Sequence, residues 1–168
     1  MKLFWQDFCD NYLEISKVRV YNEDSKNTEG QYSGIWTLYY CLQTILKLFA
    51  PFIPHITEEI YQSVYNPETS IHIKGNWPQI SSNKYDNIAE EGDALIEILD
   101  MVRKVKSEKN VSIKTSITKI ELKGANLSVE LISDLKNVTS TADIVNVEKF
   151  SIEENIYSNS KFLVNIIF

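Results

Sequence analysis

The chain contains few of the residues that build metal centres, disulfides and catalytic dyads. It has two cysteines and two histidines in 168 residues. Cys9 and Cys41 fall in apolar, helix-like stretches, which favours buried free thiols in a reducing compartment over a disulfide or a metal pair. His55 and His72 have no further cysteine or histidine at ligand spacing. The sequence therefore holds no zinc signature, and we interpret His55 as a structural or surface group.

Glycine and proline are scarce as well. Five glycines and four prolines are too few for a collagen-like or a disordered low-complexity chain. No glycine-rich phosphate loop and no nucleophile elbow is present in the sequence. Glu58 and Glu59 are adjacent, and adjacent helical residues point about 100° apart, so these carboxylates do not face one reacting centre. The sequence indicates no catalytic residue and no metal ligand in this chain.

The chain also lacks a long, purely apolar run. The longest apolar stretch, residues 35–53, contains Gln43 and Lys47 and ends in two prolines. Such a stretch is typical of a core helix and not of a membrane span. Near the N-terminus, Asp7 and Asp10 interrupt any apolar region at once, which is unlike a signal peptide. We therefore expect a cytoplasmic protein without a membrane partner.

Positive charge is in deficit overall but is unevenly placed. The net charge is −6, which argues against a simple nucleic-acid binder. Residues 1–100 hold seven basic and 15 acidic side chains, whereas residues 101–123 hold seven basic and two acidic ones. We expect any binding of phosphates to come from local basic patches and not from the electrostatic field of the whole protein.

Hydrophobic periodicity predicts a helical first part and a mixed second part. Helical spacing predicts helices over residues 3–21, 31–50, 54–64 and 86–109. A short extended piece is expected at residues 71–73. After residue 110 the period changes, and it predicts strands at 116–122, 142–148 and 161–167 with a helix at 127–137. The expected fold class is α+β, with a mainly α-helical bundle at residues 1–84 and a long helix plus a small β-α-β-β subdomain at residues 85–168.

Residues 48–61, Leu-Phe-Ala-Pro-Phe-Ile-Pro-His-Ile-Thr-Glu-Glu-Ile-Tyr, form the most informative motif. Pro51 cannot continue the preceding helix, because it lacks an amide donor and its ring clashes with the turn before it. Pro54 suits the first turn of the next helix. Glu58 and Glu59 then lie near the positive end of that helix. The motif predicts a sharp corner between two core helices.

This corner resembles the "LAPFxPxxTEE" corner of the anticodon-binding domain in class I aminoacyl-tRNA synthetases for branched aliphatic amino acids. Residues 4–14 resemble the "FWxxFCDxYLE" helix of the valyl-tRNA synthetases, and residues 70–78, which include Trp77, resemble their "SIxxxxWP" segment. Residues 101–111 are similar to their "xVRxxRxExNV" segment. We therefore identify the chain as resembling the C-terminal anticodon-binding region of that family, over about two thirds of its length.

The resemblance implies a role within a larger enzyme. The whole enzyme would join valine to its tRNA at the expense of ATP and remove mischarged threonine. The catalytic and editing domains would precede this region, so we expect the chain alone to be inactive and to bind no cofactor. ATP, magnesium and any zinc would belong to the catalytic part. The alternatives are a non-catalytic helical interaction module derived from this domain, and the same domain of an isoleucyl or leucyl enzyme.

The implied partners are the anticodon stem-loop of valine tRNA and the catalytic domain of the same enzyme. The first candidates for phosphate contacts are Lys17 and Arg19, at the end of the first predicted helix. The others lie at the end of the fourth predicted helix and are Arg103, Lys104 and Lys106. The alternative for all five is a solvated helix C-terminus, where cations are favourable in any case.

Aromatic residues are the second kind of candidate. Unstacked bases of an RNA loop stack on such rings, but most aromatic stripes at helical spacing lie in a core. The rings concerned are Trp5, Tyr12, Tyr21, Tyr32, Trp36, Tyr39, Tyr40 and Tyr61. We also expect a self-association surface near Phe4 and Phe8, because the resemblance places further bundle helices before this chain.

Overall fold

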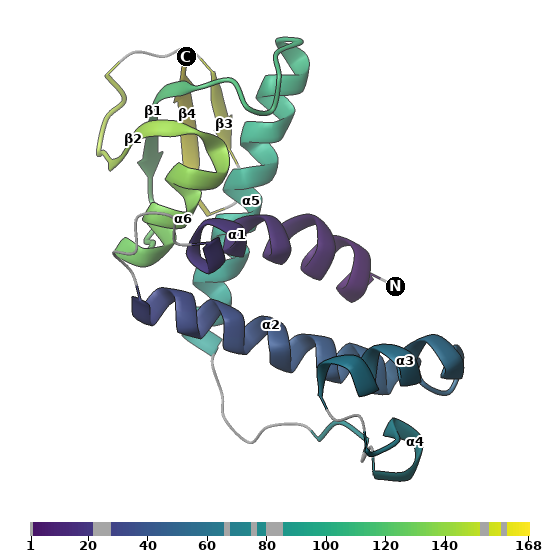
Figure 1. The fold of residues 1–168 in the computed structure, drawn as a ribbon. Helices are drawn as coiled ribbons and strands as arrows, with labels where there is room; N and C mark the ends of the chain where they lie inside the picture. Colours follow the sequence, from purple (N-terminus) through teal and green to yellow (C-terminus); the bar gives the residue numbers. More distant parts are fainter. Residues whose placement is uncertain are drawn as a thin grey trace. The chain divides into compact units, whose positions relative to one another are not determined.

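The computed structural model describes residues 2–21, 28–65, 68–74, 77–79, 86–151, 155–158 and 161–168. The chain forms two compact units. The first unit contains residues Arg19–Lys84, and the second contains Lys2–Val18 with Tyr85–Phe168. This division differs from the sequence-based division at residues 2–18, which group with the second half of the chain. Figure 1 shows the elements of each unit.

The first unit consists of helices around a small apolar core. Its helices are α2 (Thr28–Phe49), α3 (Pro54–Val64), the single turn α4 (Ile71–Lys74) and the last residues of α1 (Leu13–Tyr21). The buried apolar residues are Leu46, Ala50 and Ile71. Leu42 and Tyr61 pack against them. The core is small because much of α2 presents its aromatic side chains outward.

The proline corner has the geometry that the sequence predicts. Helix α2 ends at Phe49, and Pro54 is the first residue of α3. The amide of Ile53 donates to the Phe49 carbonyl at 3.0 Å, and the amide of Thr57 donates to the Ile53 carbonyl at 3.2 Å. The hydroxyl of Thr57 also donates to the Ile53 carbonyl, at 3.0 Å. Two prolines thus stop one helix and start the next.

The position of Glu58 near the start of α3 suggests a role within that helix, but its carboxylate binds the segment at residues 70–71. Its carboxylate accepts hydrogen bonds from the Ser70 hydroxyl at 2.9 Å and from the Ile71 amide at 3.1 Å. The Ser70 hydroxyl in turn accepts from the His72 amide at 3.1 Å. These bonds satisfy the amides that begin a helical turn. The predicted extended piece at residues 71–73 is therefore wrong, because side chains cap it as the helix α4.

The first predicted helix is present but begins with π turns. η1 (Leu3–Tyr12) runs into α1 without a break, and the Leu13 amide donates to the carbonyl of Phe8, five residues earlier. Arg103 donates to the main-chain carbonyl of Asp10 at 2.9 Å. A side chain that hydrogen-bonds to a main-chain carbonyl of a helix competes with the helix's own hydrogen bonds and distorts it locally. Hydrophobic periodicity does not report such a distortion.

The second unit packs two helices on a mixed sheet (Figure 1). Its elements after η1 and the first turns of α1 are α5 (Asp86–Glu108), β1 (Ile117–Lys123), α6 (Val129–Thr139), β2 (Thr141–Asn146), β3 (Ile156–Ser158) and β4 (Leu163–Ile167). In the described chain the strand order is β2-β1-β4-β3. β1 and β2 are parallel and joined through α6, whereas β4 is antiparallel to both β1 and β3. The α+β class is confirmed.

The core of this unit lies between α5, α6 and one face of the sheet. Ile98, Leu135, Ile120 and Ile166 are each 0% exposed, and Ile120 is paired with Ile166 across the β1–β4 ladder. The predicted elements at 86–109, 116–122, 127–137, 142–148 and 161–167 are confirmed to within two residues. The three-residue strand β3 was not predicted, because a short edge strand carries almost no alternation.

Glu121 lies on the opposite face of the sheet and is fully buried. Its carboxylate accepts hydrogen bonds from the hydroxyl of Ser151 and from its main-chain amide at 3.0 Å. It also accepts from the Lys119 ammonium at 2.9 Å and from the side-chain amide of Asn165 at 3.3 Å. Hydrogen bonding, chiefly from the Ser151 hydroxyl, lowers the pKa of Glu121 to about 2. A buried carboxylate with this many donors fastens the chain at Ser151 to the sheet.

We expect Glu121→Gln to lower the free energy of unfolding at pH 7 by about 2 kcal/mol, the scale of a hydrogen bond to a charged group. The pKa of Glu121 is lower in the folded state than its usual 4.5. Its stabilisation is therefore complete above pH 4.5 and is lost as the pH falls toward 2. Urea denaturation at pH 7, 4 and 3 should show the variant approaching the wild type. A constant difference across this range, or an equal effect of the exposed control Glu130→Gln, contradicts the assignment.

Candidate nucleic-acid interface

Two lysines, Lys104 in the C-terminal half of α5 and Lys109 just after its end, each lie over an aromatic ring. The ammonium of Lys104 lies 5.6 Å from the centroid of the Tyr157 ring and 4.0 Å from a Glu108 carboxylate oxygen, and its side chain is 64% exposed. The Tyr157 hydroxyl donates to Glu108, which raises the pKa of Tyr157. One turn further, the Lys109 ammonium lies 4.5 Å from the Phe168 ring centroid. Rings position both cations without neutralising them.

Arg103 faces a different way and is engaged inside the unit. Its guanidinium donates to the Asn11 side-chain oxygen at 2.8 Å and to the Asp10 carbonyl at 2.9 Å. Asp100 accepts a weaker bond from it at 3.3 Å. Asn11 itself is 6% exposed. Arg103 thus fastens η1 to α5 with three hydrogen bonds, which engage part of its set of five N–H donors within the unit.

Lys106 is the predicted site residue that the structure places furthest from solvent. It is 1% exposed, and its ammonium donates to the carbonyls of Ile113 and Thr139, each at 2.7 Å. Burial lowers the pKa of Lys106. A side chain in this position does not reach a phosphate on the surface, so we leave Lys106 out of the proposed phosphate contacts.

Lys17 and Arg19, the first predicted pair, lie two residues apart in α1, about 200° around the helix axis, so their side chains leave the helix on different sides. The Lys17 ammonium pairs with Glu14 at 2.6 Å, and its side chain is 52% exposed. Arg19 is half-buried where α1 runs close to α2. A Cβ added at Gly34 of α2 would lie 3.2 Å from the side chain of Val20, so this glycine permits the close approach.

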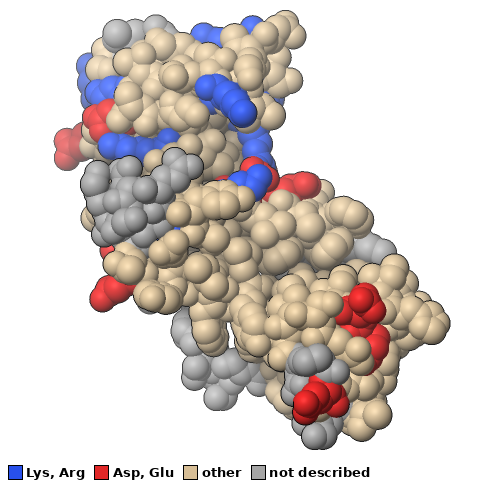
Figure 2. Space-filling model, in the orientation of Figure 1, with Lys and Arg blue, Asp and Glu red and all other residues tan. Residues whose placement is uncertain are grey.

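Charge differs between the two units on the face that Figure 2 shows. Lysine and arginine side chains gather over the part that holds the sheet and α5. The part that holds α3 and α4 shows acidic and uncharged side chains. This agrees with the sequence counts, in which residues 101–123 are the most basic stretch. On this face the basic side chains therefore lie mainly on the second unit.

The aromatic residues are more exposed than their helical spacing indicates. Tyr32, Trp36 and Tyr40 follow one another at four-residue intervals along α2 and are 71%, 65% and 48% exposed. The rings of Trp36 and Tyr40 stack at 5.5 Å with an interplanar angle of 6°. The interpretation of such rings as core residues is wrong here. Tyr12 and Tyr61, in contrast, are half-buried.

The side chains named for self-association are partly covered within η1 and its continuation. Phe4 lies edge-on to the Trp5 ring at 4.9 Å, and Phe8 stacks on Tyr12 at 6.1 Å. Both phenylalanines are half-buried, whereas Trp5 is 58% exposed. Self-association through this surface stays a prediction.

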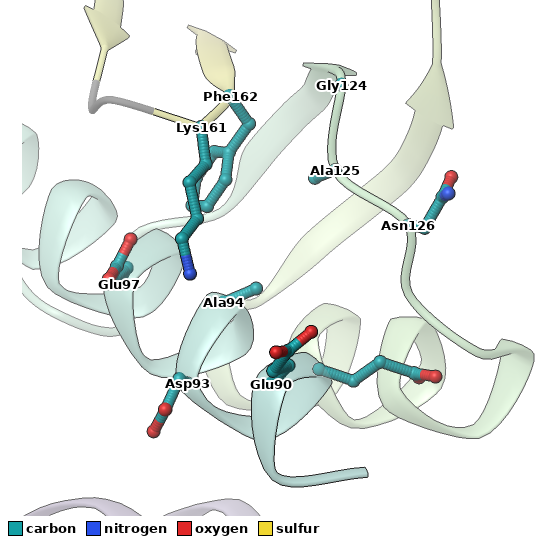
Figure 3. Close-up of a pocket in the computed structure, with 10 residues that line it drawn as sticks. Glu90, Asp93, Ala94, Glu97, Gly124, Ala125, Asn126, Lys161 and Phe162 are labelled. Atoms are coloured by element: carbon teal, nitrogen blue, oxygen red, sulfur yellow. The ribbon is translucent and has the colours of Figure 1, made fainter. Parts of the chain in front are cut away.

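An open pocket of about 330 Å³ lies between the N-terminal half of α5, the turn after β1 and the start of β4 (Figure 3). Gly124 makes this turn with a φ of 86°, and a Cβ there would lie 3.3 Å from the Lys161 carbonyl. Four carboxylates line the pocket from Glu90, Glu91, Asp93 and Glu97. Lys161 also lines the pocket, so the lining side chains give four negative charges against one positive charge, a balance that disfavours phosphate. Glu91 is also structural, because it accepts from the Ser128 amide at 3.1 Å.

Within the described ranges, no group of three or more histidine, cysteine or acidic residues could hold a metal ion. In the same part of the chain, no helix is long and apolar enough to cross a membrane.

The fold is thus an α+β domain with a basic surface on its α/β part, and comparison with known proteins gives its family. A family model described as "Anticodon-binding domain of tRNA ligase" matches residues 1–122. The chain belongs to this family. The match extends from η1 through the proline corner and α5 into β1, so it includes every segment for which the sequence shows the resemblance.

Curated relatives extend the likeness to the whole chain. The chain is 54% identical over 166 residues to the valine–tRNA ligase of Rickettsia rickettsii (strain Sheila Smith), which covers 99% of this chain and 19% of that protein. It is 57% identical over 143 residues to the valine–tRNA ligase of Rickettsia akari (strain Hartford), covering 85% of this chain and 18% of the relative. The chain thus spans about a fifth of the length of these relatives.

We expect Arg103→Ala to lower the free energy of unfolding of the second unit by about 2 kcal/mol, because it removes charge-assisted bonds to η1. Arg103→Lys should recover only part of this loss, since an ammonium does not reproduce the planar fork. Amide hydrogen exchange should speed up in residues 3–12 before it does in the sheet. Lys104→Ala is the matched control on the same turn. Equal stability of the Arg103 and Lys104 variants contradicts the role of Arg103.

Proposed function

We propose that this chain is the tRNA-binding region of a valine–tRNA ligase and that it recognises the anticodon arm of valine tRNA. The observation that carries the proposal is the anticodon-binding family match over residues 1–122. The identity to valine–tRNA ligases over nearly the whole chain selects the amino acid. The whole protein would ligate valine to tRNA using ATP and would edit mischarged threonine, with ATP and metal held outside this chain.

Exposed lysines at and just after the C-terminal end of α5 supply the electrostatic part of this function. Lys104 lies in α5 and Lys109 follows it, and the ammonium group of each lies over an aromatic ring. Each ammonium that replaces a counterion on a phosphate contributes to affinity and makes binding depend on salt. Lys17 is the next candidate, since it is exposed and pairs only with the neighbouring Glu14 among the ion pairs described. Arg19 remains a candidate on the first unit.

Exposed rings on α2 can supply the part that reads bases. Bases of a single-stranded loop stack on aromatic side chains, which contributes about 1–3 kcal/mol per base. Trp36 and Tyr40 already lie parallel and exposed. In this proposal the exposed rings of α2 are the part of the first unit that contacts the bases of the anticodon loop, in keeping with the family match.

A non-catalytic interaction module is the second candidate. The exposed apolar face of α2 and the acidic first unit favour it, because a protein partner would cover such a face. The two candidates differ in their response to RNA, which gives a direct test.

We expect this chain to bind a valine tRNA transcript at low salt and to bind it more weakly when the anticodon is replaced. Filter binding over a salt series should give a linear fall of the logarithm of the association constant with the logarithm of salt concentration. Lys17→Ala and Lys104→Ala should each reduce the slope by about one, whereas Lys149→Ala is the charge-matched control. No binding to any tRNA at low salt refutes the proposal and favours the interaction module.

A further inference from the structure

The segment between α5 and β1, residues 109–116, is a closed and ordered loop. Asn110 ends α5 in a left-handed conformation with a φ of 53°. The Val111 amide then donates to the Lys106 carbonyl at 3.0 Å, which closes the helix end. At the tip, the Thr115 amide donates to the Ser112 carbonyl at 2.9 Å, and the Ser112 hydroxyl accepts from the Lys114 amide. The loop is therefore preformed by its own backbone bonds.

Buried Lys106 holds this loop from beneath. Its ammonium donates hydrogen bonds to the Ile113 carbonyl at the loop tip and to the carbonyl of Thr139, the last residue of α6. A helix C-terminus carries partial negative charge, so it is a suitable acceptor for a buried cation. Burying a lysine is costly, and here the ammonium fixes where the loop tip lies.

The loop exposes one large apolar side chain and two lysines to solvent. Ile113 is 68% exposed at the tip although its carbonyl is fastened below. Lys109 and Lys114, on either side of it, are both exposed. Residues 109–116, Lys-Asn-Val-Ser-Ile-Lys-Thr-Ser, contain two lysines, four small polar residues and no acidic residue.

We propose that the loop of residues 109–116 is a preformed contact for the RNA sugar–phosphate backbone, with Lys106 as its positioning residue. Lys109 and Lys114 bind phosphates, and Ile113 packs against a ribose or an unstacked base between them. The inference rests on the proposed function, since it names a surface by which the chain binds tRNA. The absence of acidic residues in the loop favours a polyanion over a protein partner as its occupant.

Rigidity explains why a buried lysine serves this surface. A flexible loop loses conformational entropy when it is ordered on RNA, whereas a loop ordered beforehand does not. The phosphates of an RNA strand have fixed spacing, so two cations contribute fully only when the loop keeps their separation. Lys106 thus acts through the loop and does not touch RNA itself.

The first experiment compares two double variants of this chain that remove the same charge. Lys109→Ala/Lys114→Ala removes the loop cations. Lys123→Ala/Lys149→Ala is the control, and Lys123 ends β1, about 20 Å along the strand from the loop. We expect the loop variant to lose on the order of tenfold in affinity for valine tRNA and about two units of salt slope. The control should lose much less of both, and Ile113→Ala should lower affinity without changing the slope.

The second experiment tests Lys106 through Lys106→Met, which keeps an unbranched apolar stem and removes the ammonium. We expect faster amide hydrogen exchange at residues 111–115 and a loss of affinity for valine tRNA similar to that of the loop variant. Thermal unfolding of Lys106→Met should remain cooperative, which shows that the variant is folded. Faster exchange with unchanged tRNA affinity overturns the positioning role. Should this variant not fold, the loop variants and the control still decide the proposal.

The outcomes separate this inference from the proposed function. If the wild-type chain binds valine tRNA and the loop variant binds it equally well, the loop is not a contact and the proposed function stands. If the loop variant and the control lose affinity equally, the effect is one of net charge and the inference is overturned. If the wild-type chain binds no tRNA at low salt, the proposed function itself fails.

Discussion

The packing of α5 against the sheet is the interaction on which the second unit depends. Val102 and Val105 are each 1% exposed and contribute to one apolar core with Ile120 and Ile166. Burial of each such side chain is worth about 1.5–3 kcal/mol. Because this stripe fixes the rotation of the helix, it also fixes what the residues beside the valines can reach. Arg103 therefore meets η1, Lys104 projects to the surface, and Lys106 points inward beneath the loop.

Lys106 and Glu121, two of the buried charged residues of the unit, have opposite signs, and each is held by several hydrogen bonds. Lys106 donates to the carbonyls of a loop and of a helix end. Glu121, on the far face of the sheet, accepts from the hydroxyl and the amide of Ser151 and from side-chain donors. Neither charge adds apolar burial. Each instead determines the place of a connecting segment, since an unsatisfied buried charge would be costly.

The candidate site shows where pattern-based reasoning succeeds and where it stops. The basic stretch at residues 101–123 was correctly located as a concentration of charge, and Lys104 is exposed as the charge pattern suggests. The same pattern could not separate Lys104 from Lys106, because a charge count contains no direction. It also passed over the exposed Ile113. A two-residue difference in helix position, about 200° around the axis, decides between surface and interior.

Most of the helices, the proline corner, most of the strands and the family could be predicted before the fold was known. These depend on local signals, namely apolar period, proline placement and short motifs, which do not need the rest of the chain. The packing of the folded chain groups η1 with the second unit, makes residues 71–73 a capped turn, and leaves the rings of α2 exposed. It also decided which cations face solvent. Each of these rests on contacts between residues far apart in the chain, such as Arg103 with Asn11, which no local pattern contains.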